Sequence, residues 1–460
     1  MKNNKYRVEK DSMGSMKVPV DALYGAQTQR AVENFPISNT RFFIDFINAI
    51  IIIKRSAAIV NCKLGLLDKK ISDSIINASN QLLKESNTAH FPLDVFQTGS
   101  GTSTNMNVNE VISSLANNNS KDINVHPNDH VNMGQSSNDT IPTAINISVA
   151  LMIIKQLVPN LNKLINSIQS KEKEFKDVLK LGRTHLQDAT PIGLSQEFSG
   201  YRELLIKSKN RLIDVHNTLK RLPQGGTAVG TGINTHKDFG KLIAKEISDY
   251  TKIDFIESPN HFEAQSAQDC SVEVAGILKG LAVSLSKIAN DIRWLASGPR
   301  SGLGELNIPS VQPGSSIMPG KVNPVICESI LQVSAQVIAN DLAVTLGALG
   351  SVLELNLMLP LIAHNLLYSV SILSNSIYIF NDKLMKGISA NKIKCENYIE
   401  GSLAMCTSLA PIIGYDAAAD IAYESFNTGK TIREVVEEKN IIDKKVLNRV
   451  LNPQNMINPQ

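Results

Sequence analysis

Two runs of apolar residues in the middle of the chain recur at alternating steps of four and three residues, the spacing that keeps one face of a helix against a partner helix. The first run comprises Ile147, Leu151, Ile154, Val158, Leu161, Ile165 and Ile168. The second comprises Val274, Leu278, Leu281, Leu285, Ile288, Ile292 and Leu295. We therefore predict two long helices. The first begins at the capping residue Asp139 and is kinked but not broken at Pro159, because its periodicity continues beyond the proline.

Two further amphipathic helices are predicted, at about 325–346 and about 365–384. Gly276 and Gly280 in the second run would allow another helix to approach closely. Helices this long and apolar are difficult to cover within one monomer, which favours a bundle formed between subunits. Spacing alone fits a monomeric four-helix bundle equally well, because periodicity does not count subunits.

Loops and composition changes divide the chain into three predicted domains. These are a mostly helical N-terminal domain with binding loops at 1–137, a central long-helix domain at 138–362 and a small helical domain at 363–460. The Leu359-Pro360 step before the last predicted long helix suggests the end of the central bundle. The sequence thus predicts a mainly α protein.

Composition limits the classes of partner and the cellular location that we expect for the protein. A hydrophobic share of 43% over 460 residues supports large buried cores. The balance of 46 Lys and Arg against 43 Asp and Glu is too even to indicate nucleic acid or an anionic membrane as the main partner. Five scattered cysteines without a CxxC motif indicate reduced thiols and a cytoplasmic location. A polar start and no early apolar segment of membrane-spanning length argue against export and insertion.

The loop 314–324 (GSSIMPGKVNP) carries two hydroxyls, an ammonium and a carboxamide between glycines and prolines. Glycine allows unusual backbone angles, whereas Pro319 and Pro324 fix the local direction of the chain. A helix is predicted directly after Pro324, so Lys321 and Asn323 lie just before its positive end. Anionic ligands are favoured at such a position.

Two other segments are rich in hydrogen-bond donors. In 98–104 hydroxyls alternate with glycines, and 136–139 (SSND) leads into the first long helix, so both could converge on a carboxylate. Helix capping explains either segment as well, and one residue of the second must cap. His185 lies in a polar loop between Gly182 and Pro191. A lone histidine is usually structural, but its near-neutral pKa suits proton transfer.

These segments, in this order, resemble those of the class II fumarases in the fumarase/aspartase superfamily. The similar segments are 25–30, 98–107, 126–129, 135–140, 182–188, 225–232 and 314–324. The resemblance implies a three-domain fumarase/aspartase-like fold and a homotetramer with a twenty-helix core and active sites shared by three subunits. It further implies a hydro-lyase of the tricarboxylic acid cycle that interconverts fumarate and L-malate without a cofactor.

The resemblance also assigns roles to residues. Ser315, as an oxyanion, would remove the C3 proton of malate, and Lys321 with nearby amides would stabilise that charge. His185, with water, would handle the departing hydroxyl, and Glu328 would be its carboxylate partner. Glu328 equally suits a helix start, where the dipole stabilises a carboxylate. The implied contacts to substrate are Ser100, Gly101, Thr102, Ser136, Ser137, Asn138, Thr184, Ser316, Lys321, Val322 and Asn323.

A secondary dicarboxylate site is implied at His126, Pro127, Asn128 and Asp129. Ile123 stands where the family often has an arginine, which weakens the expectation of anion binding there. The spacing of His126 and His130 could suggest a metal site. Pro127 disfavours a regular helix across it and no second Cys or His pair lies nearby, so no metal is predicted.

The nearest alternative function is that of aspartate ammonia-lyase, which eliminates an amino group in place of a hydroxyl. Four details resemble fumarase more closely: Gly320, Thr227, Asp129 and the segment 136–138. Argininosuccinate and adenylosuccinate lyases have different loops and need room for larger substrates. A catalytically inert structural member of the superfamily is the non-enzymatic alternative. Retention of five residues argues against it, namely Ser315, Lys321, Asn323, His185 and Glu328.

Overall fold

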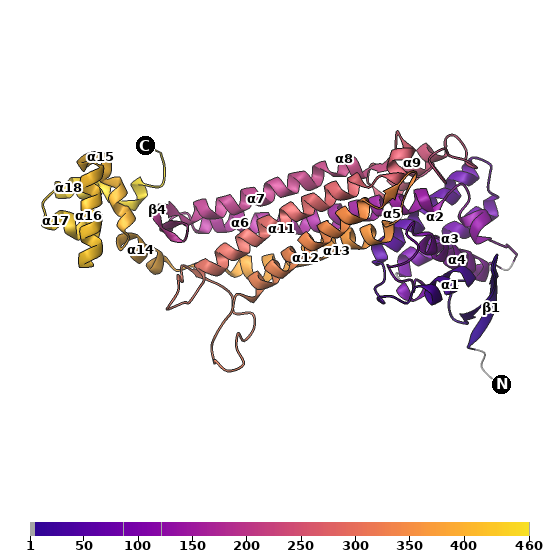
Figure 1. Ribbon diagram of the computed structural model, residues 1–460, viewed down its shortest axis with the longest axis horizontal. Coiled ribbons are helices and arrows are strands. Elements are labelled where there is room, and N and C mark those ends of the chain that lie inside the picture. Colours follow the sequence, from indigo (N-terminus) through magenta and orange to yellow (C-terminus); the bar gives the residue numbers. More distant parts are fainter. Residues whose placement is uncertain (1–4, 86, 121, 460) are drawn as a thin grey trace. The chain divides into compact units, whose positions relative to one another are not determined.

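The computed structural model describes residues 5–85, 87–120 and 122–459 and is mainly helical (Figure 1). These ranges contain eighteen α-helices, and their strands form only two-stranded sheets. The predicted mainly α class is confirmed. Lys121 and the first four residues, which the predicted N-terminal domain includes, lie outside the described residues.

The chain divides into two compact units that are not successive in sequence. The first unit comprises Met1–Pro159, Lys209–Ala282 and Ala335–Ser374, and the second comprises Asn160–Ser208, Val283–Ser334 and Asn375–Gln460. The long helices contribute residues to both units, because the boundaries fall within or beside them. The division into three domains stays a prediction.

Both long helices predicted from the apolar runs are present. The second is α11 (Asp269–Leu295), and the first consists of α5 (Ser137–Met152), a π-helical turn (Ile153–Leu157) and α6 (Val158–Glu174). In the π turn the amide of Val158 bonds to the carbonyl of Ile153, five residues earlier. Pro159 follows directly; it has no amide hydrogen for an α-helical bond, so the helix widens there, at the position of the predicted kink.

Two details of the helix predictions were wrong. The cap of α5 is Ser136, whose hydroxyl accepts from the amide of Asn138, while Asp139 lies three residues into the motif and accepts from the amide of Ser136. The last long helix, α13 (Leu359–Ile379), begins before residue 365 because Pro360 is tolerated in a first helical turn. At Gly276 and Gly280 an added Cβ would meet no described atom within 4 Å, so a close helix contact at these glycines, as in a bundle between subunits, stays a prediction.

The first unit is built around α2 (Ile44–Lys63), which packs against α3 (Lys69–Glu85), α5 and α9 (Phe239–Thr251). Its central residues are almost all buried, in keeping with contacts on several faces. The other elements here include β1 (Tyr6–Asp11), β2 (Gly14–Pro19), α1 (Ala26–Asn34), α4 (Thr102–Asn119), a π turn (Pro127–Val131), α8 (His216–Leu219), β5 (Arg221–Leu222), β6 (Ile256–Glu257), α10 (His261–Ser266), β8 (Ser351–Val352) and β9 (Leu355–Asn356).

The second unit contains the hairpin of β3 (Leu179–Thr184) and β4 (Gln187–Gly193), and α14 (Lys392–Glu400) packs against β3. Apolar residues of the C-terminal helices form its core with Leu181. Those helices, yellow in Figure 1, are α15 (Ala410–Ile413), α16 (Tyr415–Thr428), α17 (Ile432–Glu438) and α18 (Lys444–Val450). Two long helices, α7 (Leu194–Asp214) and α12 (Val325–Ala348), contribute to both units. Also present here are β7 (Leu306–Asn307), β10 (Ser389–Ala390) and a π turn (Phe380–Leu384).

Candidate active site

Hydroxyl groups meet where α4 and α5 begin, in the first unit. The hydroxyl of Thr102 lies 2.8 Å from that of Ser100 and 2.6 Å from that of Ser137. Gly101 caps α4 with a φ of 72°, and a Cβ at this position would lie 2.9 Å from the side chain of Ile141. Two helix N-termini and three hydroxyls therefore converge, an arrangement suited to a carboxylate. We call Ser100, Thr102, Ser136, Ser137 and Asn138 the hydroxyl cluster.

The start of α5 is anchored to the glycine-rich segment 225–232. Asp139 is buried and accepts hydrogen bonds from the amides of Gly225 and Thr227, at 3.1 and 3.0 Å. Burial raises the pKa of Asp139 to about 6, although these bonds act in the opposite direction. Asn138 donates to the carbonyl of Ala228 at 2.8 Å. The glycine-rich segment thus supports the hydroxyl cluster.

A buried lysine contacts the turn that precedes α5. Lys54 of α2 is fully buried and donates to the side-chain oxygens of Asn132 and Gln135. We did not predict this residue from the sequence. Its only signal was a single lysine within the apolar stretch that follows Ala49, and its partners lie about eighty residues further along the chain.

The loop 314–323 lies in the second unit and is closed at its base by its own backbone. The amide of Gly314 donates to the carbonyl of Lys321 at 2.8 Å, and the carboxamide of Asn323 donates to the carbonyl of Gly314 at 2.6 Å. A Cβ on Gly314 would lie only 2.4 Å from the carbonyl oxygen of Lys321. Only glycine therefore fits at this position without opening the base of the loop.

The side chain of Ser315 is held inside this loop. Its Oγ accepts hydrogen bonds from the amides of Ile317 and Met318, at 3.2 and 2.9 Å. Donors of this kind favour a negative charge on the oxygen. Ser315 and Lys321 line a cavity of about 440 Å³, while Ser316, Val322 and Lys321 are exposed. Among the described side chains, Lys321 has no partner and so leaves its ammonium free for a ligand.

His185 lies at the tip of the β3–β4 hairpin, not in the irregular loop that we expected. His185 and Leu186 form a two-residue turn with φ values of 57° and 61°, between the paired residues Thr184 and Gln187. This backbone is that of a tight hairpin turn, which is unusual without glycine. Thr184 and His185 are both exposed. The turn thus presents the imidazole to solvent.

Strand β3 of this hairpin is anchored by a buried carboxylate. Arg183 donates to both oxygens of the fully buried Glu305, at 3.0 and 2.9 Å, and Lys180 lies 3.5 Å from the same carboxylate. From the sequence we treated Arg183 only as part of the polar loop around His185, and we did not consider Glu305 as a residue of the site. Their separation of more than one hundred residues left no local signal.

Glu328 is a half-buried residue in the first turn of α12. Within the described part of the chain, no hydrogen bond or ion pair joins Glu328, His185 or Ser315 to one another. The structure therefore brings together the hydroxyl cluster and, separately, the groups of the loop 314–323. It leaves His185 and Glu328 on elements of their own.

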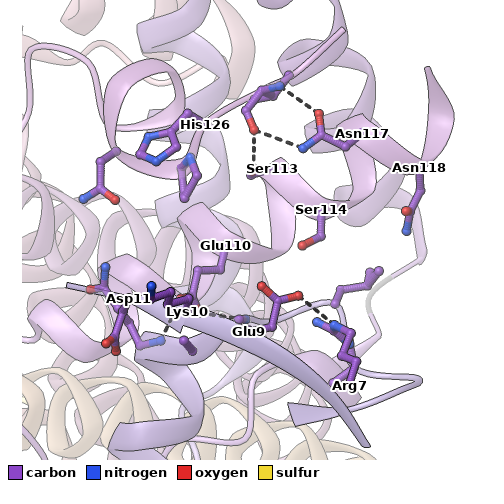
Figure 2. Close-up of a pocket in the computed structure, with 18 of the residues that line it drawn as sticks. Arg7, Glu9, Lys10, Asp11, Glu110, Ser113, Ser114, Asn117, Asn118 and His126 are labelled. Carbon is purple, nitrogen blue, oxygen red and sulfur yellow. Dashed lines mark hydrogen bonds and ion pairs between the residues drawn. The ribbon is translucent and has the colours of Figure 1, made fainter. Parts of the chain in front are cut away.

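His126, Pro127 and Asn128 of the predicted secondary site line a different cavity, of about 1010 Å³, in the first unit (Figure 2). His126 caps the π turn by accepting from the amide of Asp129, and His130 accepts from the amide of His126. Both imidazoles thus already serve the turn. In the described ranges, no group of three or more His, Cys, Asp or Glu side chains is arranged to hold a metal ion.

Acidic side chains outnumber basic ones around this cavity. Glu9, Asp11, Asp21 and Glu110 line it together with Arg7 and Lys10. Arg7 is occupied by Glu9 and by backbone carbonyls, as the dashed contact to Glu9 in Figure 2 shows. Burial raises the pKa of Glu110, which accepts from several groups at the start of α1. The cavity offers no excess of positive charge for a dicarboxylate.

Comparisons with known proteins agree along the whole chain. Residues 14–339 match the lyase family model, and residues 405–458 match the model of the fumarase C C-terminus. The chain is 45% identical to the class II fumarate hydratases of Bacillus anthracis, over 459 residues, and Helicobacter pylori strain J99, over 461 residues, each covering 99% of both proteins.

Solved structures show the same similarity. A class II fumarase from Schistosoma mansoni superposes with a TM-score of 0.95 at 38% identity, covering 98% of this chain and 99% of that one. A fumarate lyase:delta crystallin from Brucella melitensis, bound to cobalt, has a TM-score of 0.95 at 41% identity and covers 99% of this chain and 100% of its own.

Proposed function

This chain belongs to the class II fumarases of the lyase family, and from that premise we propose how its residues catalyse the reaction. The protein is a hydro-lyase that hydrates fumarate to L-malate reversibly. Its place is in the tricarboxylic acid cycle. The observation that carries the proposal is the pair of amide hydrogen bonds to Ser315 Oγ, because they supply the stabilisation that an alkoxide base needs.

In the malate-to-fumarate direction, Ser315 takes the proton from C3 and leaves the electron pair on that carbon. The pair delocalises into the adjacent carboxylate as an aci-carboxylate dianion. The C2 hydroxyl then departs as water after accepting a proton through His185, and the double bond forms. Lys321 and the hydroxyl cluster stabilise the dianion more than the singly charged carboxylate of the ground state, which lowers the barrier.

The remaining predicted contacts hold the substrate. Neutral donors of the hydroxyl cluster receive one carboxylate at the helix N-termini. Gly101, Thr184, Ser316, Val322 and Asn323 complete the contacts to the substrate. Glu328 fixes the tautomer of His185 by accepting its second ring proton. The segment 126–129 is proposed as a secondary anion site, although the charges around it give this part little support.

We propose that the active form is a homotetramer with shared sites. One face of α12 exposes Ile338, Leu342 and Leu346 at intervals of four residues, and Leu349 after the helix and Leu353 in the β8–β9 turn are exposed as well. Their exposure ranges from 43% for Ile338 to 84% for Leu353. A continuous apolar stripe of this kind calls for a partner surface. Other copies of the chain would cover it in an intersubunit bundle and complete the site around the exposed His185.

We further propose a cytoplasmic location. All five cysteines are free thiols, and burial raises the pKa of Cys270, Cys327 and Cys395 to about 12. Unpaired thiols fit a reducing compartment.

An absorbance assay in the fumarate band tests the reaction. Purified protein is given malate and, separately, aspartate. Signal with malate alone is expected, and signal with aspartate alone would assign the chain to the ammonia-lyases. If neither malate nor aspartate gives an absorbance signal, and light scattering shows the sample to be tetrameric, the result would favour an inert structural member of the superfamily.

A further inference from the structure

Lys54 is a buried charge without a directly bonded counterion. Its Nζ donates to Asn132 Oδ1 at 2.9 Å and to Gln135 Oε1 at 3.0 Å, and both acceptors are neutral. Asp139 is close enough to act on its charge, but in the described part of the chain no hydrogen bond joins the two groups. Burial lowers the pKa of Lys54 to about 7. Burying a charge in this way is costly to the fold, which calls for a compensating role.

The acceptors of Lys54 belong to one short turn, residues 132–136. The carboxamide of Asn132 donates to the carbonyl of Gln135 at 3.1 Å, so the turn is closed on itself. Asn132 Oδ1 also accepts from Asn105 and Asn109 of α4, each at 3.2 Å. Through these bonds the ammonium ties α2, the turn and α4 together.

This turn ends at the hydroxyl cluster. Ser136, its last residue, caps α5, and Ser137 follows with its hydroxyl against that of Thr102 on α4. Both sides of the cluster are therefore bonded to the same framework: α5 through the turn and α4 through Asn105 and Asn109. A change in the turn of a few tenths of an ångström would move these donors directly.

We propose that Lys54 is a positioning residue for dicarboxylate binding: its buried ammonium holds the turn 132–136 and places positive charge behind a cluster whose own donors are all neutral. The inference rests on the proposed contact between this cluster and the substrate. An uncharged side chain could fill the same space at lower cost to the fold, so packing alone does not account for a lysine. A positive charge in a low-dielectric region attracts an anion over several ångströms.

The test replaces the ammonium by an apolar side chain of similar length, Lys54→Met, in the full-length protein. Three quantities are measured: kcat, KM for malate and the inhibition constant of succinate, a four-carbon dicarboxylate that does not react. We expect KM and the inhibition constant to rise about tenfold or more. We expect kcat to stay within about threefold, because Lys54 does not touch the reacting atoms. Lys63→Met, on an exposed lysine of the same helix, should change none of the three.

Two companion variants make every outcome decisive. If Lys54→Met does not fold, Gln135→Ala removes one acceptor from the half-exposed turn and should raise the succinate constant in the same direction. If the Lys54→Met protein folds and its inhibition constant for succinate is unchanged, the inference is overturned. If Lys54→Met does not fold, an unchanged inhibition constant in Gln135→Ala overturns it. Ser137→Ala tests the premise separately. A normal succinate constant in Ser137→Ala would refute the site assignment itself and, with it, the inference.

Discussion

The hydroxyl cluster and the loop 314–323 are both candidate substrate contacts, but they are built in different ways. The cluster lies at the starts of two helices, and its groups are bonded to one another and to buried Asp139. Most of the loop is exposed, and among the described residues its hydrogen bonds run within the loop, as those of Gly314 and Ser315 do, or to the start of α12. The difference suggests a division of labour: a preformed framework binds the diacid, and a self-contained loop carries the base to it.

The sharpest test of this division is Ser315→Ala. Loss of a general base should lower kcat by roughly 10³-fold. KM and the melting temperature should change little, because the side chain is bonded only to amides of its own exposed loop. The measurement is malate turnover by fumarate absorbance, with Ser301→Ala, an exposed serine of the same unit, as control. Turnover near the wild-type rate would assign the base to another residue.

A second test uses pH, because the framework contains a buried acid. The pKa of Asp139 is about 6 in the folded protein and about 3.8 when unfolded, so the native state binds more protons between these values. The free energy of unfolding should therefore fall by about 2 kcal/mol from this group as pH rises from 4 to 6.

Urea unfolding across this pH range, with wild type and Asp139→Asn compared, isolates the effect of Asp139. The variant should lack this part of the pH dependence, whereas Asp214→Asn, an exposed residue of the same unit, should retain it. Identical pH profiles for wild type and Asp139→Asn would contradict the burial of this charge.

Gly314→Ala tests the base of the loop without touching the framework. The added methyl group would meet the carbonyl of Lys321, so the bonds that close the loop must open. Displacement of Ser315 by about an ångström should lower kcat about 10²-fold. The affinity for succinate should fall less than the turnover does, because the framework is intact. Equal losses of succinate affinity and of malate turnover would mean that the loop contributes as much to substrate binding as to catalysis.

Thr102→Val is the smallest change, and it removes the hydroxyl that links Ser100 to Ser137. We expect KM for malate to rise about tenfold with kcat nearly constant, since one hydrogen bond to a charged group is lost. Thr428→Val is the matched control, because the exposed hydroxyl of Thr428 bonds only to nearby backbone, at Glu424 and Lys430, among the described residues. A fall in kcat alone would place Thr102 among the groups that take part in the reaction. That result would contradict the division between a binding cluster and a catalytic loop.

The helices could be predicted because burial repeats along them with a local period. Pro159 also gave a correct local signal. The start of α5 was less clear, because Ser136 and Asp139 are both good capping residues and only the folded backbone shows which one caps. The beginning of α13 was missed because Pro360 was taken as a break, although a first helical turn accepts it.

The sequence pointed to the segments of the predicted site. It did not point to the buried residues that hold those segments in place. Lys54 and Glu305 work through partners far along the chain, and no local pattern shows that a charged residue is buried. The hairpin at His185 was hidden for another reason: its turn uses positive φ angles at two residues that rarely adopt them. Long-range contacts and backbone strain are thus the information that the sequence alone did not supply.

The π turn at Ile153–Leu157 has a consequence for chain length. Across it the fully buried positions are Ile153 and Leu157, whereas Ile154 and Val158 of the apolar run are only partly buried. The turn therefore shifts the phase of the inward-facing stripe by one residue. Because a π turn accommodates one extra residue, deleting a single residue there would restore an ordinary α-helix and leave the buried face of α6 directed inward. The helix can therefore lose one residue at this position without turning its apolar face to solvent.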